Sequence, residues 1–254
     1  MTRRVFCPSL CPGPLRLDPA EAHHLRDVLR VTVGDTVELF DAAGRTSQAK
    51  IESSDADGVT VRVETIREPS ATAAEVIIAS AVPKADRADW LVEKLSELGV
   101  SRWLPLRTAR SVVHPAGEAK FERWRRIAVE AAKQSRRVGV MEIATLVDVE
   151  SLPFDNVDPI VLSTREGCRP LATIETTASR RLLLIGPEGG WTDDEVTSLV
   201  ARGAREASLT ATVLRIETAA VVAAAVALAT SPLRKSISFP RSCKTPPPSA
   251  PPSL

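Results

Sequence analysis

The stretch from Leu182 to Val196, LLLIGPEGGWTDDEV, decides the fold because it joins a buried strand, a glycine-rich loop and a helix start. Its opening apolar run is short and continuous, as expected of a strand buried in a parallel sheet. Thr192 and Glu195 have the spacing of a capping box, and Gly203 can end the helix that they begin. The loop 186–190 is therefore expected to be fixed at the carboxyl edge of a sheet, where ligands of α/β proteins bind.

The GPEGG loop also limits the kind of ligand. It lacks the Gly-Lys-Ser/Thr of a P-loop and the spacing of a dinucleotide fingerprint. Its glycines allow backbone groups to approach a ligand closely. Glu188 disfavours a pyrophosphate and favours a neutral or cationic ligand, such as the sulfonium of S-adenosylmethionine. On composition alone, a plain strand-to-helix turn remains an equally good interpretation.

The residues around this stretch predict an α/β domain, because strands and helices alternate from residue 74 onward. The pattern alone favours a Rossmann-like sheet. We expect the first helix of this domain, at 86–98, to turn Trp90, Leu91, Leu95 and Leu98 toward the core. The predicted strands are EVIIASAV (75–82), SRWLPL (101–106), PIVLST (159–164) and RLLLIG (181–186), and the other predicted helices span 120–137 and 213–230.

The N-terminal part is predicted to be a small β-rich unit. Alternating apolar residues indicate strands in TVELFDAAG (36–44), RTSQAKIE (45–52) and GVTVRVETI (58–66). A helix begins at Asp18-Pro19-Ala20-Glu21, read as an N-cap, a first-turn proline and a capping-box carboxylate, and it should place His23, Arg26 and Arg30 on one face. We therefore expect domains at 1–70 and 74–230, followed by a disordered Pro/Ser-rich tail at 231–254.

Composition excludes several classes. The net charge of +1 gives no global attraction to polyanions, although most of the 33 basic residues are arginines, which bind phosphate in a bidentate fork. Cys7 and Cys11, even with His23 and His24, match no zinc-site spacing, so no metal is expected. No secretory signal opens the chain, which predicts a cytoplasmic protein. The apolar run 218–229 is too short to span a membrane.

Together these motifs resemble the ribosomal RNA small-subunit methyltransferase E family of the SPOUT superfamily. The segments that carry the resemblance are LLLIGPEGGWTDDEV, VLRIETAAVVAAAVAL (213–228), EAHHLRDVLRVTVGDTVELFD (21–41), VEKLSELGVSRWLPL (92–106) and RWRRIAVEAAKQSRR (123–137). The resemblance implies a PUA-like β-barrel domain followed by an α/β trefoil-knot methyltransferase domain. It also implies a homodimer that uses S-adenosylmethionine to methylate N3 of one uridine in small-subunit ribosomal RNA, either bare or in a 30S-type subunit.

The same resemblance implies roles for individual residues. Arg215, Glu217 and Glu188 would be catalytic, with Arg215 holding the target uridine or its phosphate. Glu217 is also explained as a carboxylate that the helix dipole favours, and helix 218–229 either packs in a dimer interface or lies in the core. The residues implied to bind the cofactor are Thr164, Ile185, Gly186, Pro187, Glu188, Gly190, Leu209, Val213 and Leu214.

Contacts to RNA are expected from basic side chains in both domains. Residues 101–137 are rich in arginine and lysine, and Arg123, Arg126, Lys133 and Arg137 fall on one helical stripe. Such a stripe suits a phosphate track, although an isolated basic helix face is more often simply solvated. The RNA-binding candidates are His24, Arg26, Arg30, Lys84, Arg123, Arg126 and Arg137, and Arg87 is also placed to reach the substrate.

The chain departs from the family pattern at two segments. Leu209-Thr210-Ala211-Thr212 stands where the family has Leu-Gly-Pro-Arg, and Ile216 replaces a threonine. Lys133-Gln134-Ser135-Arg136-Arg137 stands where the family has Glu-Gln-Cys-Gly-Arg. Two other hypotheses therefore stay open: a SPOUT enzyme that acts on transfer RNA or a ribose 2′-hydroxyl, and an RNA-binding assembly factor without turnover.

Overall fold

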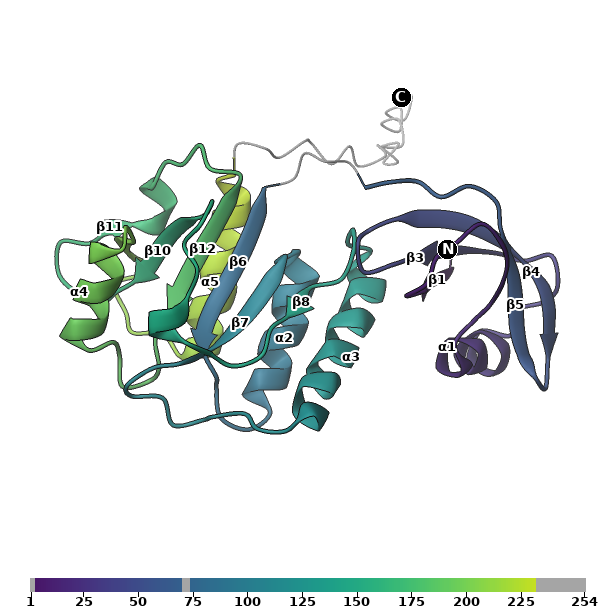
Figure 1. Cartoon of the computed structure of the whole chain (residues 1–254), viewed down its shortest axis with the longest axis horizontal. Coiled ribbons are helices and arrows are strands. Elements are labelled where there is room, and N and C mark those ends of the chain that lie inside the picture. The colour runs from purple at the N-terminus through teal and green to yellow at the C-terminus, as the bar shows by residue number, and fades with distance from the viewer. Residues whose placement is uncertain (1–2, 70–73, 232–254) are drawn as a thin grey trace, which may run out of the picture.

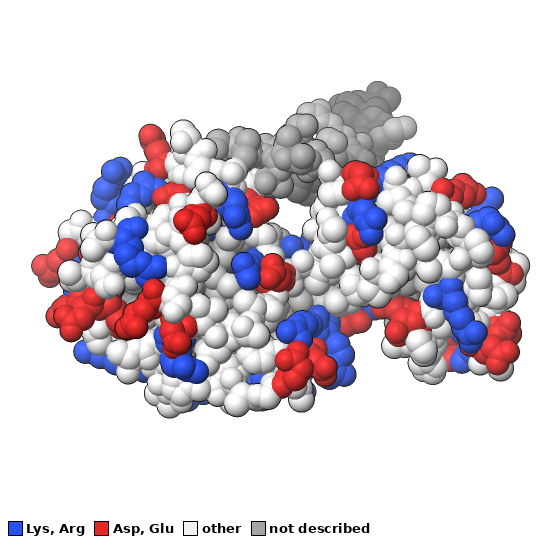
Figure 2. Space-filling model, in the orientation of Figure 1, with Lys and Arg blue, Asp and Glu red and all other residues white. Residues whose placement is uncertain are grey.

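The computed structural model describes residues 3–69 and 74–231, which form two units with one β-sheet each (Figure 1). Residues 1–2, 70–73 and 232–254 lie outside the described residues, and so does nearly all of the tail predicted to be disordered. On the face shown in Figure 2, basic and acidic side chains are interspersed over both units. That face therefore carries no extended surface of one charge, in keeping with the net charge of +1.

The N-terminal unit is a five-stranded sheet in the order β1-β3-β4-β5-β2. The strands predicted from alternation are β3 (Thr36–Phe40), β4 (Thr46–Asp55) and β5 (Gly58–Val63), which form an antiparallel meander. Alternation did not reveal β1 (Arg3–Phe6) and β2 (Gly13–Arg16), which lie at the two ends of the sheet. Both are short, and β2 has no fully buried residue, so neither carries a strong apolar signal.

The helix of this unit differs from the one expected. The Asp18 side chain caps α1 (Pro19–His23), as predicted. The chain then continues as a π-helical turn over His24–Val28, which has a different angular spacing from an α-helix. Arg30 lies beyond that turn with a φ of +50°. The expectation that His23, Arg26 and Arg30 share one regular helical face is therefore wrong.

The C-terminal unit is a parallel sheet in the order β11-β13-β10-β12-β6-β7-β8, with β9 also paired to β7. All predicted strands are present, as β6 (Glu75–Ala81), β7 (Arg102–Arg107), β10 (Asp158–Leu162) and β12 (Arg180–Ile185). The sequence did not reveal the short strands β8 (Glu142–Ile143), β9 (Val147–Asp148), β11 (Arg169–Pro170) and β13 (Arg205–Ser208). Short 3₁₀ turns lie at Val149–Ser151 and Leu171–Thr173.

This strand order is not the Rossmann-like order that the pattern favoured. The strand of the opening stretch, β12, lies between β10 and β6, and β13 lies on the other side of β10. The pattern of apolar residues indicates which segments form strands, but it does not indicate which strands are neighbours in the sheet. Because β10, β12 and β13 are adjacent or nearly adjacent and parallel, the loops that follow them leave the sheet at the same edge.

Helices cover both faces of this sheet (Figure 1). One face is covered by α2 (Arg87–Leu98), α3 (Glu118–Ser135) and α5 (Ile216–Ala229), and the other by α4 (Asp193–Ala201). Successive side chains of β12 point to opposite faces of the sheet, and helices cover both faces, which explains why its apolar run is continuous. Leu183 packs in the core with α2, α3 and α5, whereas Leu184 packs with Leu199 of α4. A strand buried on both faces needs apolar residues at every position.

Some expected details of the helices are wrong. Trp90 and Leu98 are 43% and 38% exposed, because the buried stripe of α2 runs through Leu91, Val92 and Leu95. The last helix starts at Ile216 rather than at residue 213, and the preceding residues form a loop. Because these residues form a loop and not a helical turn, they contribute one wall of a cavity at the carboxyl edge of the sheet.

The two units meet where the end of α3 contacts the N-terminal sheet. Arg4 Nη1 donates to the carbonyl oxygen of Ala132 at 3.0 Å. Lys133 Nζ lies 2.8 Å from Glu21 Oε1, and both side chains are almost fully buried. The Glu21 carboxylate therefore holds the two units together and does not form the capping box that the sequence predicted.

Candidate functional site

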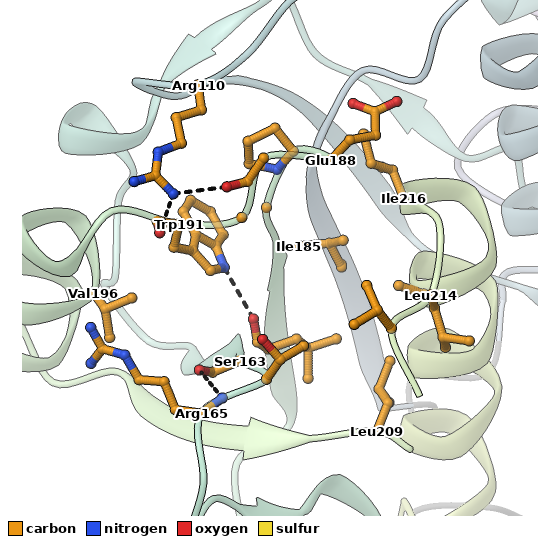
Figure 3. A pocket seen from close by; sticks show the side chains of 18 of the residues that line it. Arg110, Ser163, Arg165, Ile185, Glu188, Trp191, Val196, Leu209, Leu214 and Ile216 are labelled. Atoms are coloured by element: carbon orange, nitrogen blue, oxygen red, sulfur yellow. Dashed lines mark hydrogen bonds between the residues drawn. The ribbon is translucent and has the colours of Figure 1, made fainter. Parts of the chain in front are cut away.

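The loops after β10, β12 and β13 enclose a cavity of about 390 Å³ at the carboxyl edge of the parallel sheet (Figure 3). Its walls are segments 162–165, 185–191 and 209–214, completed by Arg110, Val196, Ile216 and Ala219. This volume lies in the range of cavities that hold small molecules. The position agrees with the edge at which a ligand was expected.

The cavity gathers every residue that the resemblance assigned to the cofactor. They come from the ends of three strands and are Thr164, Ile185, Gly186, Pro187, Glu188, Gly190, Leu209, Val213 and Leu214. Figure 3 shows Glu188 at the upper rim, and Ile185, Leu209 and Leu214 around the interior. The arrangement provides apolar walls with one carboxylate at the rim.

The first wall depends on Gly186 and Trp191. A Cβ at Gly186 would lie 3.0 Å from the Trp191 indole, so no larger residue fits without moving the ring. The indole Nε1 donates to the carbonyl oxygen of Leu162 at 3.0 Å, which ties this wall to the end of β10. Packing against the Trp191 indole, and not the backbone angle, therefore favours glycine at position 186.

The rest of the loop is fixed by its turn and by the helix that follows. Gly190 has a φ of +68°, and its N–H donates to the carbonyl oxygen of Pro187 at 2.9 Å. The capping box predicted at Thr192 and Glu195 is confirmed, and Gly203 ends α4 with a positive φ. Glu195 Oε1 additionally accepts from the N–H of Ala109 at 2.8 Å. The loop is therefore held from both sides.

The segment that departs from the family pattern forms the opposite wall. Val213 is 83% exposed. Thr210 Oγ1 donates to the carbonyl oxygen of Thr212 at 2.8 Å, so the threonine that replaces a family glycine is bound within its own loop. Ile216, which replaces a family threonine, lines the cavity as a buried apolar residue. The departures leave the cavity open.

Two of the residues implied to be catalytic lie beside the cavity and do not line it. Arg215 is exposed and occupies the N-cap position of α5. Glu217 is only 6% exposed, and its Oε1 lies 3.4 Å from Nη1 of Arg87 on α2. Within the described residues, the other oxygen of Glu217 has no hydrogen-bond partner. Glu217 therefore joins α5 to α2, whereas Glu188 is the carboxylate at the cavity.

The expected basic stripe on α3 is not a continuous RNA surface. Arg137 lies past the end of the helix, and its Nη1 donates to the carbonyl oxygens of Ser96 and Val100 at 3.1 and 2.8 Å. Burial, together with neighbouring Arg4, lowers the pKa of Arg137 to about 10. Arg137 thus stabilises the end of α2, so part of its guanidinium is engaged within the protein rather than free for RNA.

The other candidates for RNA contact differ in whether their side chains are exposed and whether they already form ion pairs within the protein. Arg123 forms an ion pair with Asp89 at 2.7 Å, and Arg26 binds Asp27. Lys133, part of the expected stripe, is buried against Glu21. The candidates with exposed side chains are His24, Arg30, Lys84, Arg123 and Arg126.

Sequence reasoning missed several residues of the cavity. Arg110 reaches it from the loop after β7, and Arg165 lies at its edge in an ion pair with Asp193. Trp191 also lines the cavity, although the sequence indicated no role for it there. None of these positions has a periodic or spacing signal, because each reaches the cavity through the tertiary fold.

Among the helices of the described residues, none is long and apolar enough to cross a membrane. Within residues 3–69 and 74–231, no group of at least three His, Cys, Asp or Glu side chains is placed to hold a metal ion.

The chain matches two family models. Residues 70–228 match an RNA methyltransferase domain, and residues 17–64 match an RNA methyltransferase PUA domain. Proteins called ribosomal RNA small subunit methyltransferase E from Synechocystis sp. and Bacillus subtilis are both 32% identical to this chain. Those alignments cover 88% and 80% of this chain, and 76% and 85% of the relatives.

A solved structure supports the same assignment. A methyltransferase from Legionella pneumophila, in complex with the bound cofactor SAM, superposes with a TM-score of 0.79 at 29% identity. The match covers 90% of this chain and 98% of that one. The expected PUA domain followed by a SPOUT methyltransferase fold is thus confirmed. The chain belongs to the ribosomal RNA small subunit methyltransferase E family.

Proposed function

We propose that this protein transfers a methyl group from S-adenosylmethionine to N3 of a specific uridine in small-subunit ribosomal RNA. The observation that carries the proposal is the cavity, whose walls are the ends of β10, β12 and β13 and whose lining includes every residue expected to hold the cofactor. The names of the relatives and the SAM-bound structure of a relative support it.

The residues of the cavity fit an adenosyl sulfonium. Among the glycines of the first wall, Gly190 has open space where a Cβ would lie, so a ligand can approach its backbone closely. Ile185, Leu209, Leu214 and Ile216 provide apolar surface for the adenosine. Glu188 places a negative charge at the rim, where it favours a cation. When bound, S-adenosylmethionine supplies an electrophilic methyl group.

The residues next to the cavity are assigned to the uridine. N3 of uridine becomes a nucleophile when its proton is lost or its carbonyl oxygens are polarised. In this proposal Arg215 stabilises the negative charge that develops on the uridine oxygens or binds its phosphate. In this proposal Glu188, which lines the cavity, accepts the proton, whereas Glu217 is buried against Arg87. Glu217 keeps the first turn of α5 and hence Arg215 in place.

RNA binding is proposed to use the exposed cations of both units. Lys84 follows β6 at the carboxyl edge of the sheet, while His24 and Arg30 lie in the N-terminal unit. Arg26, Arg123 and Arg126 contribute further positive charges. Of these, Arg26 already forms an ion pair with Asp27, and Arg123 forms one with Asp89. Phosphate contacts of this kind position the RNA and make its affinity depend on salt.

The assembly is proposed to be a cytoplasmic homodimer with a trefoil knot in the methyltransferase domain. The support for the dimer is α5, an almost uncharged helix on which Val221, Val222 and Val226 remain partly exposed. Apolar helix faces that stay partly exposed in a monomer commonly pack in symmetric interfaces. The support for the knot is the order of β10, β12 and β13 and the membership in the family.

The test is mass spectrometry of nucleosides from small-subunit ribosomal RNA, isolated from cells with and without the gene. Loss of N3-methyluridine in the deletion strain, restored by the wild-type gene, is the expected result. The Arg215→Ala variant should fold normally and fail to restore the modification. Loss of a methylated transfer RNA nucleoside or ribose would instead identify another SPOUT specificity. Unchanged nucleosides and no heat of S-adenosylmethionine binding would favour a non-catalytic assembly factor.

A further inference from the structure

A turn after β7 packs against the loop that forms the glycine wall of the cavity. Within this turn, Thr108 N donates to Ser111 Oγ at 3.0 Å, and Ser111 N donates to the carbonyl oxygen of Thr108 at 3.1 Å. The turn is anchored to α4, because Ala109 N donates to Glu195 Oε1 at 2.8 Å. Its backbone is thus fixed relative to the helix that follows the loop.

From this turn, Arg110 extends to the carbonyl oxygens of the glycine wall (Figure 3). Its Nη1 donates to the carbonyl oxygen of Gly189 at 2.8 Å and lies 3.4 Å from that of Trp191. Its aliphatic stem packs on Gly189, where an added Cβ would lie 3.4 Å from Cβ and Cδ of Arg110. Arg110 itself lines the cavity.

These contacts determine the orientation of the peptide between Gly189 and Gly190. A trans peptide is planar, so its C=O and N–H point in opposite directions. Here the C=O accepts from Arg110, and the N–H donates to the carbonyl oxygen of Pro187 at 2.9 Å. Because glycines flank this peptide on both sides, it could otherwise rotate at little cost. Arg110 therefore favours one orientation of the peptide.

The same contacts restrain Trp191. Its carbonyl lies next to Arg110, while its indole packs over Gly186 and donates to Leu162. We propose that Arg110 is a positioning residue for the ligand cleft, which holds the Gly189–Gly190 peptide and Trp191 in the arrangement that admits an adenosyl sulfonium. This inference rests on the function proposed above.

The direction in which the Kd for S-adenosylmethionine changes when Arg110 is removed distinguishes a positioning role from a purely electrostatic one. S-adenosylmethionine carries a net positive charge, because its sulfonium and ammonium groups outweigh its carboxylate. Removing a nearby arginine should strengthen its binding if charge alone mattered. Weaker binding after removal of Arg110 therefore indicates loss of the hydrogen bonds that shape the cleft.

The experiment is isothermal titration calorimetry of S-adenosylmethionine with the full-length wild type, Arg110→Ala, Arg110→Lys and the control Arg107→Ala. Arg107 is an exposed neighbour that pairs with Asp148 at 3.2 Å, so its removal changes the net charge equally. Loss of a charged hydrogen bond predicts that Arg110→Ala raises the Kd about tenfold. The Kd of Arg110→Lys should lie between those of the wild type and Arg110→Ala, since lysine keeps a hydrogen-bond donor but lacks the planar fork of arginine. The Kd of Arg107→Ala should equal that of the wild type.

Two further readouts accompany the titration. For methylation, the KM for S-adenosylmethionine should rise in Arg110→Ala while kcat at saturating cofactor stays close to that of the wild type. Tryptophan emission of the unliganded protein should shift in Arg110→Ala but not in Arg107→Ala, because Trp191 becomes less restrained. An equal Kd for wild type and Arg110→Ala, or an equal loss in Arg107→Ala, overturns the inference and leaves the proposed function intact. Failure of the wild type to bind S-adenosylmethionine overturns both.

Discussion

Replacing Gly186 by alanine tests the packing of the glycine wall directly. The new Cβ would lie 3.0 to 3.1 Å from Cε2, Cδ2 and Nε1 of Trp191. Carbon atoms prefer a separation of about 3.5 Å or more, so the ring must move by a few tenths of an ångström. That shift lengthens the 3.0 Å hydrogen bond from the indole to Leu162. The substitution thus perturbs a wall of the cavity without removing any group.

The expected magnitude combines two costs. Overpacking of a fitted site costs about 1 to 3 kcal/mol, and a weakened hydrogen bond about 1 kcal/mol. We expect Gly186→Ala to lower stability by about 2 kcal/mol, which corresponds to a drop in Tm of about 4 to 8 °C. Because the indole lines the cavity, the Kd for S-adenosylmethionine should rise by about tenfold or more.

The assay is thermal unfolding together with calorimetric titration, and Gly99→Ala serves as the control. Gly99 ends α2 with a φ of +96°, and no atom lies within 4 Å of the position that an added Cβ would occupy. Alanine there is strained by about 1 kcal/mol but touches no part of the cavity. Gly99→Ala should therefore lower Tm and leave the Kd unchanged. A Gly186→Ala protein with wild-type Tm and Kd would refute the argument that packing requires glycine.

Three further predictions concern the end of α3. Arg136→Gly should raise stability by about 1 kcal/mol in urea unfolding, because Arg136 has a φ of +53° where the family has glycine. Arg137→Ala should cost about 2 kcal/mol, since buried carbonyl oxygens lose their donor, and RNA affinity in filter binding should not change. Burial by itself lowers the pKa of Lys133, but hydrogen bonds with Glu130 and Glu21 outweigh it and raise that pKa. The stability lost in Lys133→Met, about 3 kcal/mol, should therefore be constant up to about pH 10 and decrease as the pH rises further, in a pH series of urea unfolding.

The sequence by itself determined the elements whose signals are local. The buried strand, the glycine loop and the capped helix of residues 182–196 were all predictable, because a capping box and a glycine turn depend on residues a few positions apart. The resemblance, carried by those motifs and by residues 213–228, also located the walls of the cavity. Periodicity gave the long strands and missed the short ones, which contain too few residues for a pattern.

Only the tertiary structure decided which side chains serve the site and which serve the fold. Arg110 meets Gly189 across 79 residues, and Glu217 meets Arg87 across 130. Arg137 is the type of residue that commonly contacts RNA, but here it is half-buried and donates to carbonyl oxygens at the end of a helix. Contacts between residues so far apart leave no trace in spacing or periodicity, because they depend on strand order and helix packing. The strand order itself follows from how all the apolar faces are buried together, which no single segment specifies.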